Sequence, residues 1–337
     1  MIYPKFIKRG DKIGVTATSA GNGDELHIRE LEFSEEAFKQ IGYNIIETKN
    51  VRTDHKLRSS SKETRAKEFM ELIEDKNINA IITARGGEFL VEIIPYIDFN
   101  LIKQNPKWVQ GYSDTTGIGF CITTISDIAT IYGENFNSFA MQPWHDALHK
   151  NVELLEGKIL EQNSFDKYQE NWQQGIIGNE TWKTTKKVRW KNARGEAKIE
   201  IEGRLIGGCI DVLTLLVGTK YDKVETFCKR YENDGIIWFF DNCELSSEGV
   251  LRALWQMKEA GWFNRVKGFI FGRTMTRKSN CDISFEESIL DAIGELNVPI
   301  IFDADIGHVP PQMTLINGAI AKIISKDGKG KIKFVLT

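Results

Sequence analysis

The sequence has little of what marks several large classes of protein. Among 337 residues there are only five histidines and five cysteines. The chain has no apolar run of the roughly 18 residues that a membrane span requires. A formal net charge of −3 gives no sequence-wide basic field for nucleic acid or for an anionic membrane surface. We therefore expect neither nucleic acid nor a membrane among the partners of this protein.

The cysteines exclude two further classes. They are odd in number, widely spaced and without a C-x-x-C pair, which argues against a disulfide framework and a zinc cluster and predicts reduced thiols. None lies on a recognisable turn for a nucleophile.

Residues 1–12 have neither the sustained apolar core nor the cleavage site of a signal peptide. These features together predict a cytoplasmic protein.

The histidines offer one candidate metal pair. His145 and His149 are four residues apart and would share a helix face, but no glutamate follows His145 as it does in H-E-x-x-H. We expect no metal and no cofactor.

Strand and helix patterns alternate along the chain, which favours an α/β fold with a parallel sheet. In the first half, the apolar runs 12–18, 43–48, 79–84, 107–110 and 128–133 predict strands, and 28–40 and 61–73 predict helices. In the second half, we expect strands at 197–205, 236–240, 266–272 and 298–306. We expect helices at 246–257 and 285–296 and a further helix from residue 207. The chain should close with a hairpin at 321–336.

Between these halves the periodicity is lost. We divide the chain into an N-terminal domain (1–145), a linker or excursion (146–194) and a C-terminal domain (195–337). The stretch from about 142 to 194 contains four tryptophans that either cover the core or line a substrate groove through stacking: Trp144, Trp172, Trp182 and Trp190.

The segment Gly111-Tyr112-Ser113-Asp114-Thr115 follows the fourth predicted strand and precedes a small-residue helix. A serine on such a turn resembles the nucleophile elbow G-x-S-x-G, although Thr115 stands where the second glycine belongs. The alternative is an ordinary Ser-Asp helix cap. Loops at the carboxyl ends of parallel strands share one edge of the sheet, so we expect residues 19–21, 85–87 and 111–114 to converge.

Further residues would complete a catalytic site around Ser113. His308 ends a predicted buried strand and comes just before two prolines. Asp241 and Glu244 follow another predicted buried strand. A hydroxyl nucleophile needs a base, and the base needs an acid to orient it. The alternative for His308 is a structural role.

The turn Arg85-Gly86-Gly87 would supply an oxyanion hole. Its glycines can present backbone N–H groups, and the N–H of Asp114 is the natural second donor. The alternatives for this turn are a phosphate-binding loop or a plain strand exit.

These motifs together resemble the LD-carboxypeptidase family of serine peptidases, which includes the microcin C immunity peptidases. The resemblance covers roughly residues 4 to 325. It also rests on residues 95–99, on 105–107, on 203–208 and on the block that ends at Arg252.

The resemblance implies a flavodoxin- or glutamine-amidotransferase-like N-terminal α/β domain, a smaller C-terminal α/β domain and a homodimer. It implies Ser113 as nucleophile, His308 as base, and Gly86 and Asp114 as oxyanion donors. The family usually has glutamate at the acid position; here Asp241 occupies it, and Glu244 is the alternative. Glu88 also departs from the residue often found after the two glycines.

The function that follows is hydrolysis of an L,D-peptide bond, with release of a C-terminal D-amino acid from a murein tetrapeptide. Arg85 favours a peptide with a free carboxylate. The alternatives are cleavage of an aminoacyl-nucleotide conjugate, as by the immunity peptidases, and a non-catalytic binding protein on the same scaffold.

Overall fold

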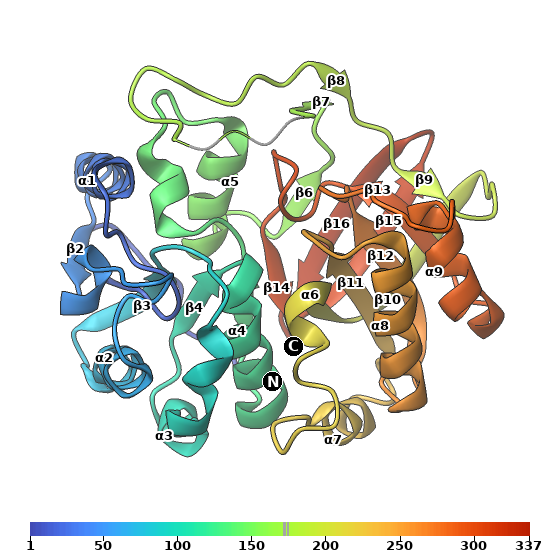
Figure 1. The fold of residues 1–337 in the computed structure, drawn as a ribbon, viewed down its shortest axis with the longest axis horizontal. Coiled ribbons are helices and arrows are strands. Elements are labelled where there is room, and N and C mark those ends of the chain that lie inside the picture. Colours follow the sequence, from blue (N-terminus) through green and yellow to red (C-terminus); the bar gives the residue numbers. More distant parts are fainter. Residues whose placement is uncertain (171–172, 174) are drawn as a thin grey trace. The chain divides into compact units, whose positions relative to one another are not determined.

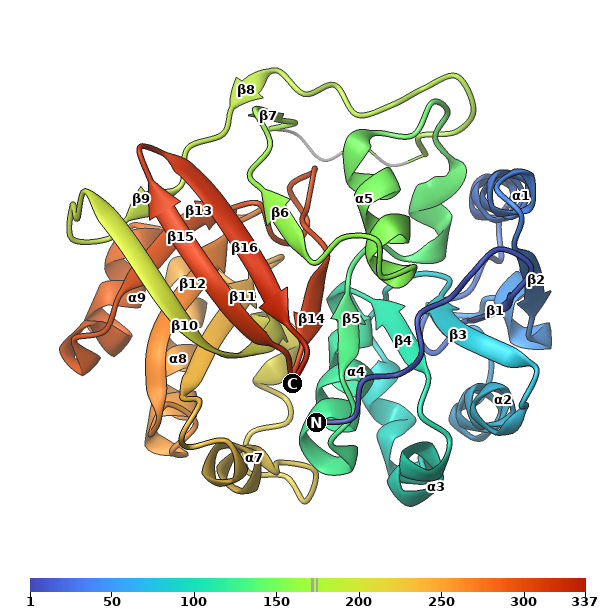
Figure 2. The same cartoon turned by 180° about the vertical axis from the view of Figure 1, so that it is seen from behind.

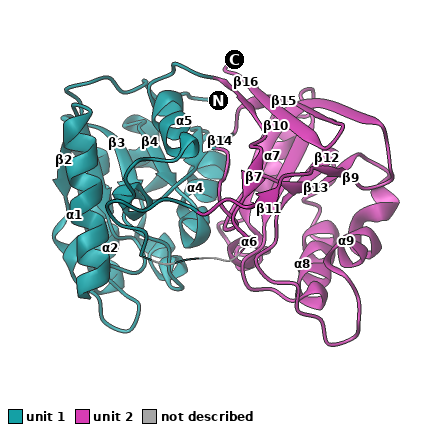
Figure 3. Ribbon diagram, turned by 90° about the horizontal axis from the view of Figure 1, so that it is seen from above, with its two compact units in different colours: residues 1–159, 173–182, 314–316 teal, residues 160–172, 183–313, 317–337 magenta. Residues whose placement is uncertain are grey.

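A computed structural model describes residues 1–170, 173 and 175–337 (Figure 1). Trp172, one of the four tryptophans singled out above, lies outside the described residues. The chain divides into two compact units, which Figure 3 distinguishes by colour. Unit 1 comprises residues 1–159, 173–182 and 314–316, and unit 2 comprises residues 160–172, 183–313 and 317–337.

Unit 1 is built on a six-stranded sheet in the order β14-β5-β4-β3-β1-β2. The pairings β2–β1, β1–β3, β3–β4 and β4–β5 are parallel. The strands are β1 (Lys12–Thr16), β2 (Asn44–Glu47), β3 (Ile78–Thr83), β4 (Trp108–Gly111), β5 (Thr130–Tyr132) and β14 (Leu315–Asn317). The helices are α1 (Glu25–Gln40), α2 (Lys62–Glu74), α3 (Phe99–Gln104), α4 (Thr116–Cys121) and α5 (Asp146–Leu155).

Unit 2 has an eight-stranded mixed sheet in the order β6-β16-β15-β10-β11-β12-β13-β9 (Figure 2). Its strands are β6 (Glu161–Asn163), β9 (Lys191–Asn192), β10 (Lys198–Cys209), β11 (Ile236–Asp241), β12 (Val266–Gly272), β13 (Ile300–Ala304), β15 (Ile320–Lys326) and β16 (Lys329–Val335), and β7 (Lys167–Tyr168) pairs with β8 (Lys186–Lys187) separately. Its helices are α6 (Ile210–Leu213), α7 (Val224–Arg230), α8 (Ser247–Glu259) and α9 (Phe285–Ile293).

Short turns of other helix types connect these elements. They are η1 (Lys49–Arg52), η2 (Leu90–Glu92), η3 (Ile94–Tyr96), η4 (Ser113–Thr115), η5 (Ile122–Ser126), η6 (Phe136–Ala140) and η7 (Gly294–Leu296). No helix among the described residues is both long enough and apolar enough to cross a membrane.

The strand β10 shows how burial follows sequence. Residues 198–202 alternate between exposed and buried side chains and pair antiparallel with β15, whereas residues 204–209 are buried and pair parallel with β11. An antiparallel rim can leave one face in water, and a central parallel strand is covered on both faces. The helix expected from residue 207 is confirmed as α6, but it begins later, at Ile210, because Gly207 and Gly208 continue the strand.

The closing hairpin is confirmed as the antiparallel pair β15–β16. The expectation that periodicity is lost from about residue 142 to 194 is wrong at the helix α5, and the same stretch contains the short strands β6 to β9. The apolar residues of α5 do have helical spacing, but the polar, tryptophan-rich residues that follow hide the pattern. The buried side chains of α5 are Ala147, Leu148, Asn151, Val152, Leu154 and Leu155.

Candidate active site

Ser113 lies on a strained turn between β4 and α4. Its φ of +62° is in the left-handed region, which non-glycine residues rarely adopt. Such strain is typical of a serine at a strand-to-helix elbow. A Cβ at Gly111 would lie 2.3 Å from Thr83 Oγ1 and 2.6 Å from Thr115 Cγ2, so glycine is required there. Thr115 thus occupies the space that Gly111 leaves, and its hydroxyl bonds Thr83 at 2.8 Å.

Three loops of unit 1 meet around Asp114. The buried carboxylate accepts hydrogen bonds from Ser19 Oγ at 2.5 Å and from the Leu90 N–H at 2.9 Å. Burial raises the pKa of Asp114, and the hydrogen bonds from Ser19 and from the backbone of Leu90 and Phe89 act against that rise. The loop after β1, the loop after β3 and the Ser113 turn are therefore held together by one carboxylate.

The Gly86 loop lies directly against Ser113. A Cβ built on Gly86 would be 3.0 Å from Ser113 Oγ and 3.7 Å from the Asp114 backbone nitrogen. The Gly86 N–H donates to no acceptor in the described part of the chain. Gly87 has a φ of +151°, and a Cβ there would lie 2.4 Å from Ser19 Oγ. Both glycines are thus needed for the close approach of this loop to the serine.

Arg85 is half-buried and turns toward the loop that follows β1. Its guanidinium donates to the Gly21 carbonyl at 2.9 Å. Burial lowers the pKa of Arg85, while Glu30, Asp24 and Asp54 act in the opposite direction, so its charge is already opposed by carboxylates. Glu88, two residues beyond Gly86, is exposed.

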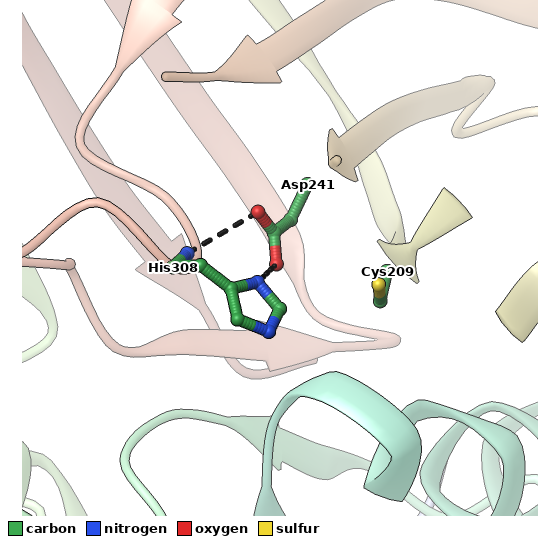
Figure 4. A group of neighbouring side chains, drawn as sticks. All are labelled: Cys209, Asp241 and His308. Atoms are coloured by element: carbon green, nitrogen blue, oxygen red, sulfur yellow. Dashed lines mark hydrogen bonds and ion pairs between the residues drawn. The ribbon is translucent and has the colours of Figure 1, made fainter. Parts of the chain in front are cut away.

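In unit 2, Asp241 and His308 form a buried pair. Asp241 is the last residue of β11, and His308 follows β13 by four residues. One carboxylate oxygen bonds the ring Nδ1 of His308 at 2.6 Å, and the other accepts the His308 backbone N–H at 3.3 Å (Figure 4). A Cβ at Gly307 would lie 1.9 Å from Asp241 Oδ1, so only glycine leaves room for this carboxylate.

The environment of His308 favours its protonated form. Burial alone would lower the pKa of the ring, but the negative charge of Asp241 and its hydrogen bond raise that pKa well above the usual value. The side chain of Cys243 acts in the same direction through a hydrogen bond.

Glu244, the alternative acid, is exposed. Its backbone N–H donates to Asp211 at 2.9 Å, as the N–H groups of Cys243 and Leu245 do at 3.1 Å. Asp211 therefore fixes the loop after Asp241. The carboxylate that meets the His308 ring is that of Asp241.

Cys209, Asp241 and His308 are the one candidate metal-ligand group among the described residues, with donor atoms within 4.8 Å of one another. Two of these donors bond each other, and a metal would also require a Cys209 thiolate. Burial, together with Asp241 and Asp211, raises the pKa of the Cys209 thiol well above its usual range. The group therefore has the character of an acid–base pair beside a protonated thiol. All five cysteines are free.

The histidine pair and the described tryptophans have structural partners. His145 caps α5 by accepting the Ala147 N–H at 3.2 Å, and the His149 ring lies 5.5 Å from Trp144. Trp182 lies 5.3 Å from His145, whereas Trp190 is buried and donates to Asp305 at 2.9 Å. Trp190 therefore contributes to the interior of unit 2.

Several residues that build these two sites were not singled out from the sequence. The sequence presents Ser19 only as part of a polar loop, and nothing local marks Asp211. Their partners lie 32 to 95 residues away along the chain. A charged residue directly after an apolar strand is the one signal that Arg273 and Asp305 share with Asp241.

Comparison with known proteins supports the reading of the motifs. Residues 13–133 match the LD-carboxypeptidase N-terminal domain and residues 202–323 the LD-carboxypeptidase C-terminal domain. The chain is 26% identical over 339 residues to the putative carboxypeptidase YocD of Bacillus subtilis, with 98% of each chain covered. It is 24% identical over 321 residues to a probable murein peptide carboxypeptidase of the same organism, covering 94% of this chain and 90% of the relative.

A solved structure shares the whole fold. The MccF-like protein of Bacillus anthracis superimposes with a TM-score of 0.85 at 26% identity, and all of both chains is covered. The expected two-domain α/β fold is thereby confirmed. The two domain matches together span more than half of the sequence. This chain belongs to the LD-carboxypeptidase family.

Proposed function

We propose that this protein is a serine carboxypeptidase that hydrolyses an L,D-peptide bond and releases the C-terminal D-amino acid of a murein tetrapeptide. The observation that carries the proposal is the buried bond of 2.6 Å between Asp241 and His308 Nδ1. A ring held through Nδ1 uses Nε2 for proton transfer, as a general base does beside a serine. The strained backbone of Ser113 supports the choice of nucleophile.

In the proposed reaction, Ser113 Oγ attacks the carbonyl carbon of the scissile bond while its proton passes to His308 Nε2. The N–H groups of Gly86 and Asp114 stabilise the negative oxygen of the tetrahedral intermediate. The C–N bond then breaks, and His308 returns the proton to the departing amine. A water molecule, deprotonated by His308, hydrolyses the acyl-serine. Asp241 holds the ring and stabilises its cationic form throughout.

We assign Arg85 the recognition of the substrate carboxylate, with Gly87 shaping the oxyanion loop. A guanidinium binds a terminal carboxylate through paired hydrogen bonds. The neighbouring carboxylates of Glu30, Asp24 and Asp54 compete for this cation, so the interaction contributes to binding more than to the chemical step.

Replacing the nucleophile tests the proposal. Ser113→Ala should lower the rate of D-alanine release from murein tetrapeptide by about 10⁴-fold or more. Glu74→Gln, at an exposed residue at the end of α2, is the control and should keep its rate within about threefold, because surface substitutions away from such features are nearly neutral. A Ser113→Ala variant within about tenfold of the wild type would overturn the assignment.

The family resemblance favours one second candidate, cleavage of an aminoacyl-nucleotide conjugate by the same residues, because the related microcin C7 self-immunity protein MccF has been solved in complex with aspartyl sulfamoyl adenosine. Three tryptophans are candidates for stacking on the base of such a conjugate: Trp172 lies outside the described residues and Trp190 is buried, which leaves Trp182. Assaying both substrates with one enzyme preparation separates the candidates: the murein proposal requires the higher kcat/KM for the tetrapeptide.

We further propose a homodimer, as the family resemblance implies, and a cytoplasmic location. Light scattering during size-exclusion chromatography should give twice the 38.4 kDa mass of one chain.

A further inference from the structure

The turn that carries His308 is held in place by the guanidinium of Arg273. Arg273 follows β12 directly, and its backbone N–H donates at 3.2 Å to the carbonyl of Ala304, the last residue of β13. Its side chain is 5% exposed, although arginine is rarely buried unless it is paired. A buried guanidinium requires partners for its charge and its N–H groups.

Those partners lie on both sides of His308. Before the histidine, Nη1 of Arg273 donates to Asp305 Oδ1 at 2.5 Å. After it, Nη2 donates to the carbonyls of Val309 at 2.9 Å and Pro311 at 2.8 Å. Val309 is the neighbour of His308 in the chain, so one planar group binds the Asp305 side chain before the base and the backbone carbonyls after it.

Asp305 is the second anchor of the turn and is fully buried. Besides Arg273, it accepts the Trp190 indole N–H at 2.9 Å and the Phe165 N–H at 3.3 Å. Its own carbonyl accepts the Met313 N–H at 2.7 Å. Burial raises the pKa of Asp305, and the charge and hydrogen bond of Arg273 oppose that rise.

The tryptophan-rich excursion also contacts the turn that carries His308. The Tyr168 ring lies 4.8 Å from the Arg273 guanidinium carbon, and the Gln169 N–H donates to the Pro310 carbonyl at 2.8 Å. Residues 165–169 and Trp190 therefore cover the side of the turn to which Arg273 binds. This gives part of the excursion a role that a substrate groove would not explain.

We propose that Arg273, with Asp305 as its counter-ion, is the positioning residue of the catalytic base: it holds the turn so that His308 stays on Asp241. The inference rests on the proposed function, since it assumes that His308 is the base. Arg273 touches neither Asp241 nor the ring in any described contact, so it acts through the backbone. A displacement of about 1 Å of such a group costs about 10²-fold in rate.

The test separates positioning from folding. Arg273→Met alone leaves Asp305 buried without its cation and is expected to unfold more easily. The double variant Arg273→Met/Asp305→Asn removes both charges, keeps an oxygen that can accept the Trp190 and Phe165 N–H groups, and should fold, as thermal unfolding can verify. We expect its kcat to fall about 10²-fold and its KM to stay within about threefold. The midpoint of its kcat/KM as a function of pH should shift toward the pKa of an ordinary histidine. Arg277→Met, at an exposed arginine four residues away, should match the wild type.

Proton NMR supplies a readout that does not depend on peptidase activity. The low-field signal of the His308 Nδ1–H bound to Asp241 should be sharp in the wild type, in Ser113→Ala and in Arg277→Met. It should be broadened or lost in the folded double variant. If the double variant keeps both this signal and its kcat, Arg273 is merely structural and the inference is wrong. If Ser113→Ala remains active, the proposed function fails instead, whatever the NMR result.

Discussion

The nucleophile turn of unit 1 and the acid–base pair of unit 2 are held in different ways. Around Ser113 the contacts come from hydroxyls, backbone N–H groups and one carboxylate, Asp114, and the serine itself has a strained backbone. Around His308 the contacts come from two buried ion pairs, Asp241–His308 and Arg273–Asp305. The first region depends on close packing of three loops, and the second depends on charge.

This difference has a chemical reason. A serine nucleophile needs backbone N–H donors nearby, and glycine-rich loops supply them only if they approach closely. A histidine base must change its charge during the reaction, so a fixed negative partner stabilises its cationic form. Substitutions should therefore affect the two regions differently: loss of charge should dominate in unit 2 and loss of packing in unit 1.

The largest effect is expected at the acid. Asp241→Asn should lower kcat by about 10⁴-fold with little change in fold, because an amide keeps the shape but no longer stabilises the histidine cation. Glu244→Gln is the matched control and should remain within about twofold, since its carboxylate is exposed. Steady-state kinetics of D-alanine release measures both. A large loss in Glu244→Gln with an active Asp241→Asn would transfer the acid role to Glu244.

A smaller effect is expected at the carboxylate of unit 1. Asp114→Ala leaves Ser19 and the Leu90 N–H without their acceptor, which should lower the free energy of unfolding by about 2–4 kcal/mol. It should also lower kcat by about 10²-fold, because the oxyanion loop loses its fixed position. Urea unfolding and kinetics of the same preparations test this. Unchanged stability would show that the three loops hold together without Asp114.

The next prediction concerns substrate binding. Arg85→Met should raise KM for a peptide with a free carboxylate by about tenfold and change kcat by less than about threefold. The same substitution should have no effect on a substrate whose terminal carboxylate is amidated. Equal effects on both peptides would restrict Arg85 to a structural role through its bond to Gly21.

The smallest expected effect is a shift in pH dependence. The pKa of His308 is raised, so its neutral, basic form appears only as pH rises through that higher value. The value of kcat/KM should therefore increase with pH, and the midpoint of this increase should lie above about pH 6.5. In Asp241→Asn the midpoint should fall toward the ordinary value, since the charge of Asp241 no longer offsets the effect of burial. The ion pair should likewise stabilise the folded state most below about pH 6.5 and less as pH rises through the raised pKa. A midpoint that does not move would show that Asp241 does not control the base.

Much of unit 1 could be predicted from the sequence. Its strands are short apolar runs that end in polar or glycine-rich loops, and parallel topology brings those ends together. The meeting of Ser19, Gly87 and Asp114 follows from that rule. The exact role of Thr115 does not, because it depends on the space beside Gly111 and on the partner Thr83.

Less of unit 2 could be predicted. His308 and Asp241 stand out because each follows a buried strand, but their pairing depends on contacts 67 residues apart in the chain. Arg273 and Asp305 look like ordinary charged residues after strands. Their burial results from Trp190, Phe165 and Tyr168, which come from a segment without clear periodicity. Long-range pairing of this kind leaves no local pattern to read.

The central claim is that Ser113 of unit 1 and the Asp241–His308 pair of unit 2 act in one reaction. Labelling with a fluorophosphonate, followed by peptide mass spectrometry, tests it most directly, because the reagent reacts only with an activated serine. The account predicts a single adduct on Ser113, formed in the wild type and at least about 10³-fold more slowly in His308→Gln. An adduct on another residue, no adduct in the wild type, or equal labelling of His308→Gln would contradict it.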